Sequence, residues 1–248
     1  MPKLIVMAGP NGAGKTTTSK LILAGARKVA EFVNADIIAV EQRLDDIAAG
    51  RAMLGRLDAL TRERKDIAFE TTLSSASLRN RISAMREAGY VFTLVYVWIP
   101  SAEMSIERVA ARVRAGGHYI PEDVIRRRYP RSLENLFNVF IPLADAWIML
   151  NNSPLDHPVK IAERDAGGPL RVHDQALWDN LRRKYMKPID GVREQESVPA
   201  PGFTMDDIYQ AACRAVEEAI ARHRARGESV VIWRDGKIVE LKPEEIDV

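Results

Sequence analysis

The chain has 248 residues, with 36 basic and 34 acidic side chains, and 46% of its residues are hydrophobic. These values indicate one large globular domain with at most a small appendix, and they exclude a disordered chain. The single cysteine excludes a disulfide scaffold and a zinc cluster, and every apolar run is too short to span a membrane. We therefore expect a reduced, cytoplasmic protein that has no membrane or nucleic acid among its partners.

Short apolar runs alternate along the chain with longer amphipathic ones. The expected strands are Lys3–Ala8, Phe32–Asp36, Ile67–Glu70, Tyr90–Ile99, Trp147–Leu150 and Val159–Ala162. The expected helices are Thr16–Ala26, Ile37–Lys65 with a break near Gly50, Ala76–Ala88 closed by Gly89, Ala102–Ala115, and Glu122 to about Asn138 with a kink at Pro130. This alternation predicts an α/β fold in which helices cover both faces of a parallel sheet.

The tail has its own signals. A proline-rich stretch at 187–202 is typical of a linker, and Thr204–Arg226 reads as a helix that Thr204 and Asp207 cap together. Two β-rich runs then flank Asp235-Gly236, which predicts a type I′ hairpin. We therefore expect a core over residues 1–170, a helix and linker over 171–203, and a C-terminal helix plus β-hairpin over 204–248.

A glycine-rich motif follows the first strand directly. Residues 9–16 read Gly-Pro-Asn-Gly-Ala-Gly-Lys-Thr and match G-x-x-x-x-G-K-[ST], with a strand before them and a helix after them. In such a loop, Lys15 reaches the β- and γ-phosphates and the Thr16 hydroxyl ligates Mg²⁺. No N-K-x-D motif for guanine is present, which favours ATP. The expected nucleotide contacts are Gly9, Pro10, Asn11, Gly12, Ala13, Gly14, Lys15, Thr16 and Thr17.

Carboxylates follow two of the expected strands, at the sheet edge where ligands of such folds bind. Glu70 closes an apolar strand, which is costly for an ionisable group unless it is exposed or used. Asp36 is a candidate proton acceptor for a hydroxyl that receives phosphate. The alternative is that Asp36 only caps the following helix.

Arginines flank a second glycine pair. Arg108 and Arg112 lie four residues apart on one expected helix, and Gly116-Gly117-His118 and the run Arg126–Arg128 follow. This pattern predicts a lid whose arginines stabilise charge on a transferring phosphoryl group. The alternatives are a solvated basic face for the arginines and a surface position for His118.

Taken together, these motifs resemble the zeta-toxin family, in particular its chromosomal branch described as predicted ATPases. The matching segments span about residues 1–152 and are Ala8–Thr17, Phe32–Asp36, Phe69–Thr72, Arg108–Val113 with Gly116–His118, Ile125–Tyr129 and Arg131–Leu136. The resemblance implies a P-loop kinase fold that requires ATP and Mg²⁺. Characterised members phosphorylate a hydroxyl on the amino sugar of UDP-N-acetylglucosamine.

The resemblance also implies roles for single residues. It places the catalytic base on Asp36, substrate contacts on Glu70 and Thr72, and phosphate contacts on Arg108 or Arg112 and near Arg128. This sequence departs from the toxins at Thr71, where they usually have Gly, at Ser74, where they have Arg, and at His118, which aligns with their basic loop residue.

The sequence thus predicts an ATP- and Mg²⁺-dependent phosphotransferase that acts on an alcohol group. The alternative is a nucleotide-switched ATP-binding protein that works through a protein partner, such as an antitoxin. The candidate catalytic residues are Lys15, Asp36, Arg108, Arg112 and Arg128. The candidate substrate contacts are Asp36, Glu70, Thr71, Thr72 and His118, and the candidate metal ligand is Thr16.

Overall fold

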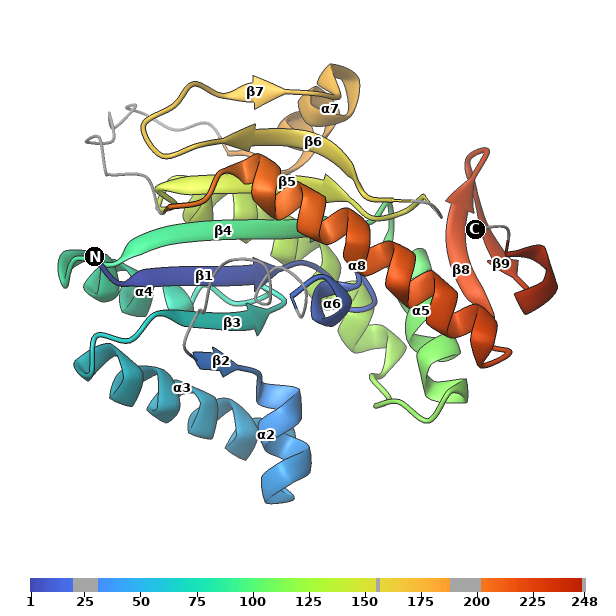
Figure 1. The fold of residues 1–248 in the computed structure, drawn as a ribbon, viewed down its shortest axis with the longest axis horizontal. Coiled ribbons are helices and arrows are strands. Elements are labelled where there is room, and N and C mark those ends of the chain that lie inside the picture. Colours follow the sequence, from blue (N-terminus) through green and yellow to red (C-terminus); the bar gives the residue numbers. More distant parts are fainter. Residues whose placement is uncertain (20–30, 155–156, 188–201, 247–248) are drawn as a thin grey trace.

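A computed structural model describes residues 1–19, 31–154, 157–187 and 202–246. Its centre is a seven-stranded sheet with the order β2-β3-β1-β4-β5-β6-β7 (Figure 1). The strands are β1 (Lys3–Ala8), β2 (Glu31–Val33), β3 (Ile67–Thr71), β4 (Val91–Trp98), β5 (Ala146–Asn151), β6 (Val159–Arg164) and β7 (Arg171–Val172). The order places the strand that precedes the phosphate loop in the interior of the sheet, between β3 and β4.

The first five strands are parallel, as predicted, but the last two are not. β6 pairs antiparallel with β5, and β7 pairs antiparallel with β6. The expected strand at Val159–Ala162 is present as β6, whereas β7 was not predicted. The short connection after β5 is the physical reason for the reversal, because a parallel neighbour needs a long crossover segment.

The described helices are α2 (Ala35–Gln42), α3 (Asp46–Arg62), α4 (Leu78–Glu87), α5 (Ala102–Arg114), α6 (Glu122–Asn135), a π-helical turn (Leu136–Phe140), α7 (Gln175–Tyr185) and α8 (Met205–Ala225). Residues 15–19 are also helical. The rest of the helix expected at Thr16–Ala26 and most of the expected linker lie outside the described residues. None of the described helices combines the length and the apolar composition that crossing a bilayer requires.

One predicted helix break is in the wrong place. The chain turns at Arg43, which adopts a left-handed φ of 53°, and not near Gly50, which lies inside α3. Asp45 then starts α3, because its side chain accepts hydrogen bonds from the backbone N–H groups of Ile47 and Ala48. Pro130, where a kink was predicted, lies inside α6.

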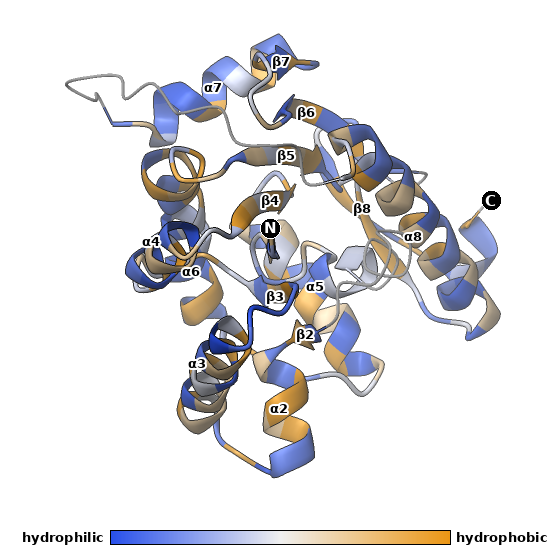
Figure 2. Cartoon of the chain, turned by 60° about the vertical axis from the view of Figure 1, so that its left-hand side comes forward, coloured by the Kyte–Doolittle hydropathy of each residue, from blue (hydrophilic) through white to orange (hydrophobic). Residues whose placement is uncertain are grey.

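The sheet has a separate hydrophobic core on each face. Alternate residues of β1 show this: Leu4 and Val6 pack with α3 to α7, whereas Ile5 and Met7 pack with α8. Figure 1 shows α8 crossing its face of the sheet toward α5. Figure 2 shows apolar residues in the strands and also along α2. No residue of α2 is buried, and Val40 is 79% exposed.

The C-terminal segment forms as predicted. Thr204 and Asp207 make the reciprocal hydrogen bonds of a capping box at the start of α8. Strands β8 (Val230–Arg234) and β9 (Lys237–Leu241) form a hairpin, and both Asp235 and Gly236 have positive φ angles, of 51° and 76°. Strand β8 packs against α5, so the end of the chain returns to the phosphate loop.

Candidate functional site

The phosphate loop has the backbone shape that the motif requires. Gly9, Gly12 and Gly14 all have positive φ angles. A Cβ atom at Gly9 would lie 2.2 Å from the carbonyl oxygen of Val97 on β4, so only glycine fits there. The loop therefore leaves β1 close against the neighbouring strand and curls into the helical residues 15–19.

Two polar side chains that were not predicted hold this loop. The amide Nδ2 of Asn152 donates to the carbonyl of Ala13 at 2.8 Å, and a Cβ at Gly14 would lie 2.5 Å from the same nitrogen. The Ser105 hydroxyl of α5 donates to the carbonyl of Asn11 at 2.6 Å. The sequence does contain a sign of this role. Asn151 and Asn152 follow the apolar run of β5, and ligands of such folds bind at the carboxyl ends of the strands.

Lys15 and Glu70 lie at the centre of the site. The Nζ of Lys15 donates to the carbonyl of Pro10 at 2.8 Å. Glu70 accepts a hydrogen bond from the Thr16 hydroxyl at 2.8 Å and another from the Ser19 hydroxyl at 2.6 Å. The structure thus joins the carboxylate at the end of β3 to the first turn after the phosphate loop.

The surroundings of Lys15 lower the pKa of its ammonium group to about 8. Loss of hydration in the loop is the main cause, and the negative charges of Glu70 and then Asp36 act in the opposite direction. The positive charges of Arg112 and Arg128 lower the value further. Four predicted site residues from four elements are therefore electrostatically coupled to Lys15.

Asp36 does not cap the helix that it begins. The cap of α2 is Asn34, whose Oδ1 accepts from the backbone N–H of Asp36 at 2.8 Å. The alternative reading of Asp36 as an N-cap is therefore wrong. The carboxylate of Asp36 is exposed in the first turn of α2 and lines the same cleft as Lys15.

The lid arginines separate into different environments. Arg112 and Arg128 line the cleft, and Arg112 donates to the backbone carbonyl of His118 at 2.6 Å. Arg126 instead pairs with Glu103 at 2.5 Å. Arg108 also lines the cleft, but its Nε donates to the carbonyl of Val231 in the C-terminal hairpin at 2.8 Å. Burial lowers the pKa of Arg108 to about 10, a value at which the side chain stays charged at neutral pH.

A cleft of about 1520 Å³ brings most of the predicted residues together. Those that line it are Asn11, Gly12, Gly14, Lys15, Thr16, Thr17, Asp36, Glu70, Thr71, Thr72, Arg108, Arg112, His118 and Arg128. Gly9, Pro10 and Ala13 do not line it. One substrate candidate is also paired within the site: the hydroxyls of Thr72 and Ser74 are 2.9 Å apart.

The donor set fits a magnesium–nucleotide complex. Mg²⁺ prefers oxygen ligands and is usually held by few protein groups together with substrate phosphates. The Thr16 hydroxyl and the Glu70 carboxylate supply such oxygens next to Lys15. The curled loop and the start of its helix present N–H groups and a positive dipole end to phosphate.

Comparison with known proteins identifies the family to which the chain belongs. Residues 4–132, just over half of the chain, match the AAA domain family. The chain belongs to this family. A Haemophilus influenzae protein of uncharacterised function is 33% identical over 132 residues, which are 51% of this chain and 92% of that protein.

Solved structures share the fold at low sequence identity. A structure from the PezAT chromosomal toxin–antitoxin system of Streptococcus pneumoniae matches with a TM-score of 0.53 and 14% identity, over 88% of this chain and 87% of that one. The AvrRxo1-ORF1:ORF2 complex with ATP matches with a TM-score of 0.58 and 17% identity, over 88% and 76% of the two chains. These matches confirm the P-loop kinase-type fold, and the AAA domain supports ATP binding.

Proposed function

We propose that this protein is an ATP- and Mg²⁺-dependent kinase that transfers the γ-phosphate to a hydroxyl group of a small molecule. The observation that carries the proposal is the position of two carboxylates, Asp36 and Glu70, on the same cleft as the phosphate loop. A protein that only switches with its nucleotide has no need of a proton acceptor beside Lys15. A kinase does need one, because the acceptor hydroxyl must lose its proton.

The site residues divide the work of transfer. The acceptor oxygen bonds to the γ-phosphorus, the bond to the bridging oxygen breaks and ADP leaves, while the hydroxyl proton passes to the carboxylate of Asp36. Lys15, Arg112 and Arg128 stabilise the negative charge of the phosphoryl group as it moves. Thr16 and Glu70 would hold Mg²⁺, which would supply neutralisation of the phosphate charge.

We propose UDP-N-acetylglucosamine or a related sugar nucleotide as the acceptor. The resemblance to zeta toxins motivates this choice. The wall of the cleft after β3 supports it, because hydroxyl side chains suit the hydroxyls of a sugar; this wall is lined by Thr71, Thr72, Ser74, Ser75 and Ser77. Two of the differences from the toxins, Thr71 and Ser74, fall on this wall.

A transfer assay tests the proposal. The protein is incubated with ATP, Mg²⁺ and either UDP-N-acetylglucosamine or a bacterial metabolite extract, and mass spectrometry is used to find a compound that has gained one phosphoryl group. We expect such a product with the wild type and none with Lys15→Ala, which lacks the cation of the phosphate loop and controls for contaminating kinases. Hydrolysis of ATP without any phosphorylated metabolite would contradict the proposal.

The second candidate function is a nucleotide-dependent switch with a protein partner. Both structural matches described above come from two-component complexes. Beside the cleft, α2 also exposes apolar side chains, including Ile37 at 41% and Val40 at 79%. If the transfer assay gives no product, capture of a partner on immobilised protein in the presence and absence of ATP is the experiment to follow.

A further inference from the structure

The cleft extends beyond the phosphate loop to the C-terminal segment, residues 202–246. One stripe of α8 lines it, formed by Val216, Ala219, Ile220 and His223 at helical spacing. The turn after α8 and the start of β8 continue this wall, from Arg226 to Ile232. This wall lies outside residues 4–132, the part of the chain that matches the AAA domain family.

The sheet order says which part of a nucleotide faces this wall. Asp36, the proposed proton acceptor, follows β2, and Glu70 lies at the end of β3, so both are on one side of β1. A γ-phosphate that is to be transferred must point to that side. The nucleoside end then points to the opposite side, toward Asn152 after β5, Arg108 on α5 and the C-terminal segment.

Arg108 marks the boundary between the two ends of the cleft. Its Cβ lies beside the phosphate loop, because a Cβ atom at Gly12 would be 3.0 Å from it. Its Nε donates to the carbonyl of Val231 in the hairpin. The hairpin therefore orients an arginine that connects the phosphate loop to the C-terminal segment.

We propose that the C-terminal segment forms the pocket for the adenosine moiety of the bound ATP. This inference rests on the proposed function, since it takes ATP as the ligand of the phosphate loop. The wall has the composition that a nucleoside needs, because a flat base packs on aliphatic groups and polar atoms contact its edge and the ribose. Ala219 and Val231 supply the aliphatic groups. His223, Arg226 and Ser229 supply the polar atoms.

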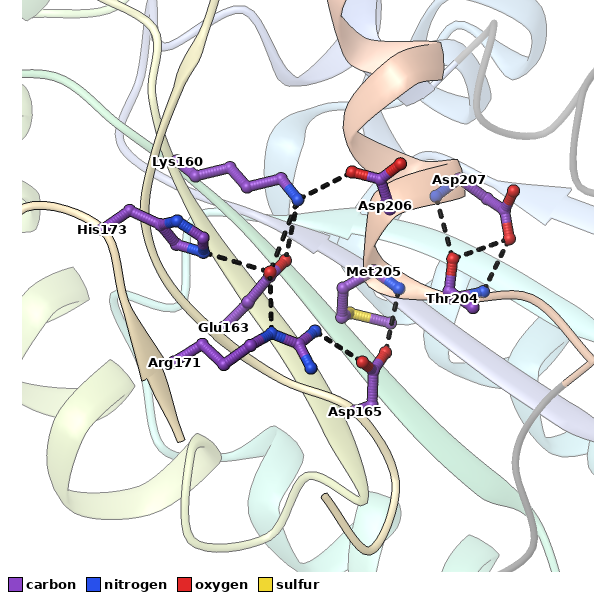
Figure 3. A network of polar contacts seen from close by, with 9 residues as sticks. All are labelled: Lys160, Glu163, Asp165, Arg171, His173, Thr204, Met205, Asp206 and Asp207. Atoms are coloured by element: carbon purple, nitrogen blue, oxygen red, sulfur yellow. Dashed lines mark hydrogen bonds and ion pairs between the residues drawn. The ribbon is translucent and has the colours of Figure 1, made fainter. Parts of the chain in front are cut away.

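The segment is attached firmly enough to serve as a wall. At the start of α8, the backbone N–H of Met205 donates to Asp165 at 3.0 Å, and Asp206 pairs with Lys160 at 2.9 Å (Figure 3). In the hairpin, the N–H of Trp233 donates to the carbonyl of Ser153 at 3.0 Å. The start of α8 is thus fixed to β6 and the residue after it, and the hairpin is fixed to the segment after β5.

Binding of two different ligands tests the nucleoside pocket and the phosphate site independently. ATP contacts both sites, whereas inorganic tripolyphosphate with Mg²⁺ contacts only the phosphate loop. In Ala219→Trp, an indole occupies the proposed base pocket. We expect the Kd for ATP to rise by about tenfold or more and the Kd for tripolyphosphate to stay unchanged. The matched control is Ala221→Trp, two residues away on an exposed position of the same helix that does not line the cleft.

The outcomes distinguish this inference from the proposed function. If the wild type binds both ligands and Ala219→Trp binds ATP as tightly as the wild type, the pocket is elsewhere and the inference is wrong. If the wild type binds neither ligand, the proposed kinase itself fails. ATP binding that depends on Ala219, without any transfer, supports the pocket and contradicts the kinase.

Photolabelling of the wild type with 8-azido-ATP tests the same point without a substitution, and so decides the matter if Ala219→Trp does not fold. We expect the label in peptides that cover residues 216–232. Label found only in other peptides would overturn the inference. Excess tripolyphosphate should suppress the labelling, because both ligands compete for the phosphate loop.

Discussion

The charge of Lys15 depends on its surroundings in the free phosphate loop and on whether a phosphate is bound there. Its ammonium group is poorly hydrated inside the loop and close to two cleft arginines, so its pKa is about 8. A triphosphate beside it adds several negative charges, which favour the protonated form. The free protein therefore loses a proton near pH 8 that the ATP complex retains.

This difference predicts a pH-dependent affinity for ATP. Above pH 8, where the triphosphate is already fully ionised, binding must be accompanied by uptake of a proton at Lys15. We expect the ATP affinity to fall by up to about tenfold per pH unit above pH 8, with uptake of about one proton in calorimetry at pH 9. In Lys15→Arg the guanidinium stays charged over this range, so the slope should disappear. Equal slopes in the two proteins would contradict the assignment.

The same pKa has the opposite consequence for folding. The unfolded chain holds the Lys15 proton up to its ordinary pKa of 10.5, whereas the native chain without ligand releases it near 8. Between these values the unfolded state binds more protons, so this group raises stability as pH increases and lowers it as pH falls through 8. Affinity for ATP and stability of the free protein thus respond to alkaline pH in opposite directions.

Asp36 is the residue on which the kinase proposal depends most. Asn at this position keeps the size of the side chain but cannot accept a proton. Because Asn34 is the helix cap, Asp36→Asn should fold and bind ATP like the wild type, while phosphoryl transfer falls by about 10²- to 10⁴-fold. Initial rates and ATP titrations measure both quantities.

The control for Asp36→Asn is Glu41→Gln, which makes the same kind of change at an exposed position of α2 outside the cleft. It should leave the transfer rate unchanged. Full activity in Asp36→Asn would remove the proton acceptor from the mechanism and favour the nucleotide-switch alternative. A loss of Mg²⁺-dependent ATP affinity in Asp36→Asn would instead assign Asp36 to the metal.

Among the elements, helices α5 and α6 each carry an arginine, Arg112 and Arg128 respectively, whose charge acts on Lys15. Arg112→Ala should lower kcat by about 10²-fold and change the Kd for ATP only a few-fold, because its charge is needed most as the γ-phosphoryl group moves. Arg127→Ala removes the same charge from an exposed position outside the cleft and should have no effect on kcat. Equal turnover in the two variants would contradict a catalytic role for Arg112 and favour the alternative that it belongs to a solvated basic face.

Elements with a local signal could be predicted from the sequence. The hairpin follows from Asp235-Gly236, the α8 start from Thr204 and Asp207, and the phosphate loop from its glycines and Lys15. The α2–α3 break was predicted near Gly50, but this glycine has open space around it and is tolerated within α3, whereas Asp45 caps the start of the helix.

Contacts between distant parts of the chain could not be predicted. The bond from Asn152 to the phosphate loop joins residues 139 positions apart, and the bond from Arg108 to Val231 joins residues 123 positions apart. Neither residue type nor spacing encodes such pairings. They depend on how the sheet is ordered and on which face α8 covers. The C-terminal side of the cleft was therefore missed, although its elements were found.

At the scale of the whole molecule, a network of ion pairs around the buried Glu163 ties the last two sheet strands together beside α8. Glu163 on β6 is 2% exposed, and its carboxylate is 3.1 Å from both Arg171 Nε on β7 and His173 Nε2 and 3.4 Å from Lys160 Nζ (Figure 3). Lys160 also pairs with Asp206 on α8, and Arg171 pairs with Asp165, which binds the first turn of α8. One carboxylate thus organises the cations that hold the C-terminal segment on the core.

Replacing this carboxylate tests how far the network stabilises the molecule. In Glu163→Gln the amide can still accept one hydrogen bond, but Lys160 and Arg171 keep their charges without their buried counterion. We expect the free energy of unfolding to fall by about 2–3 kcal/mol in urea denaturation. Glu240→Gln, in the exposed pair with Arg114, should cost less than about 1 kcal/mol. Because the network docks α8, Glu163→Gln should also weaken ATP binding more than tripolyphosphate binding. Equal losses of stability in the two variants would show that α8 is held by its apolar contacts with the sheet and not by these ions.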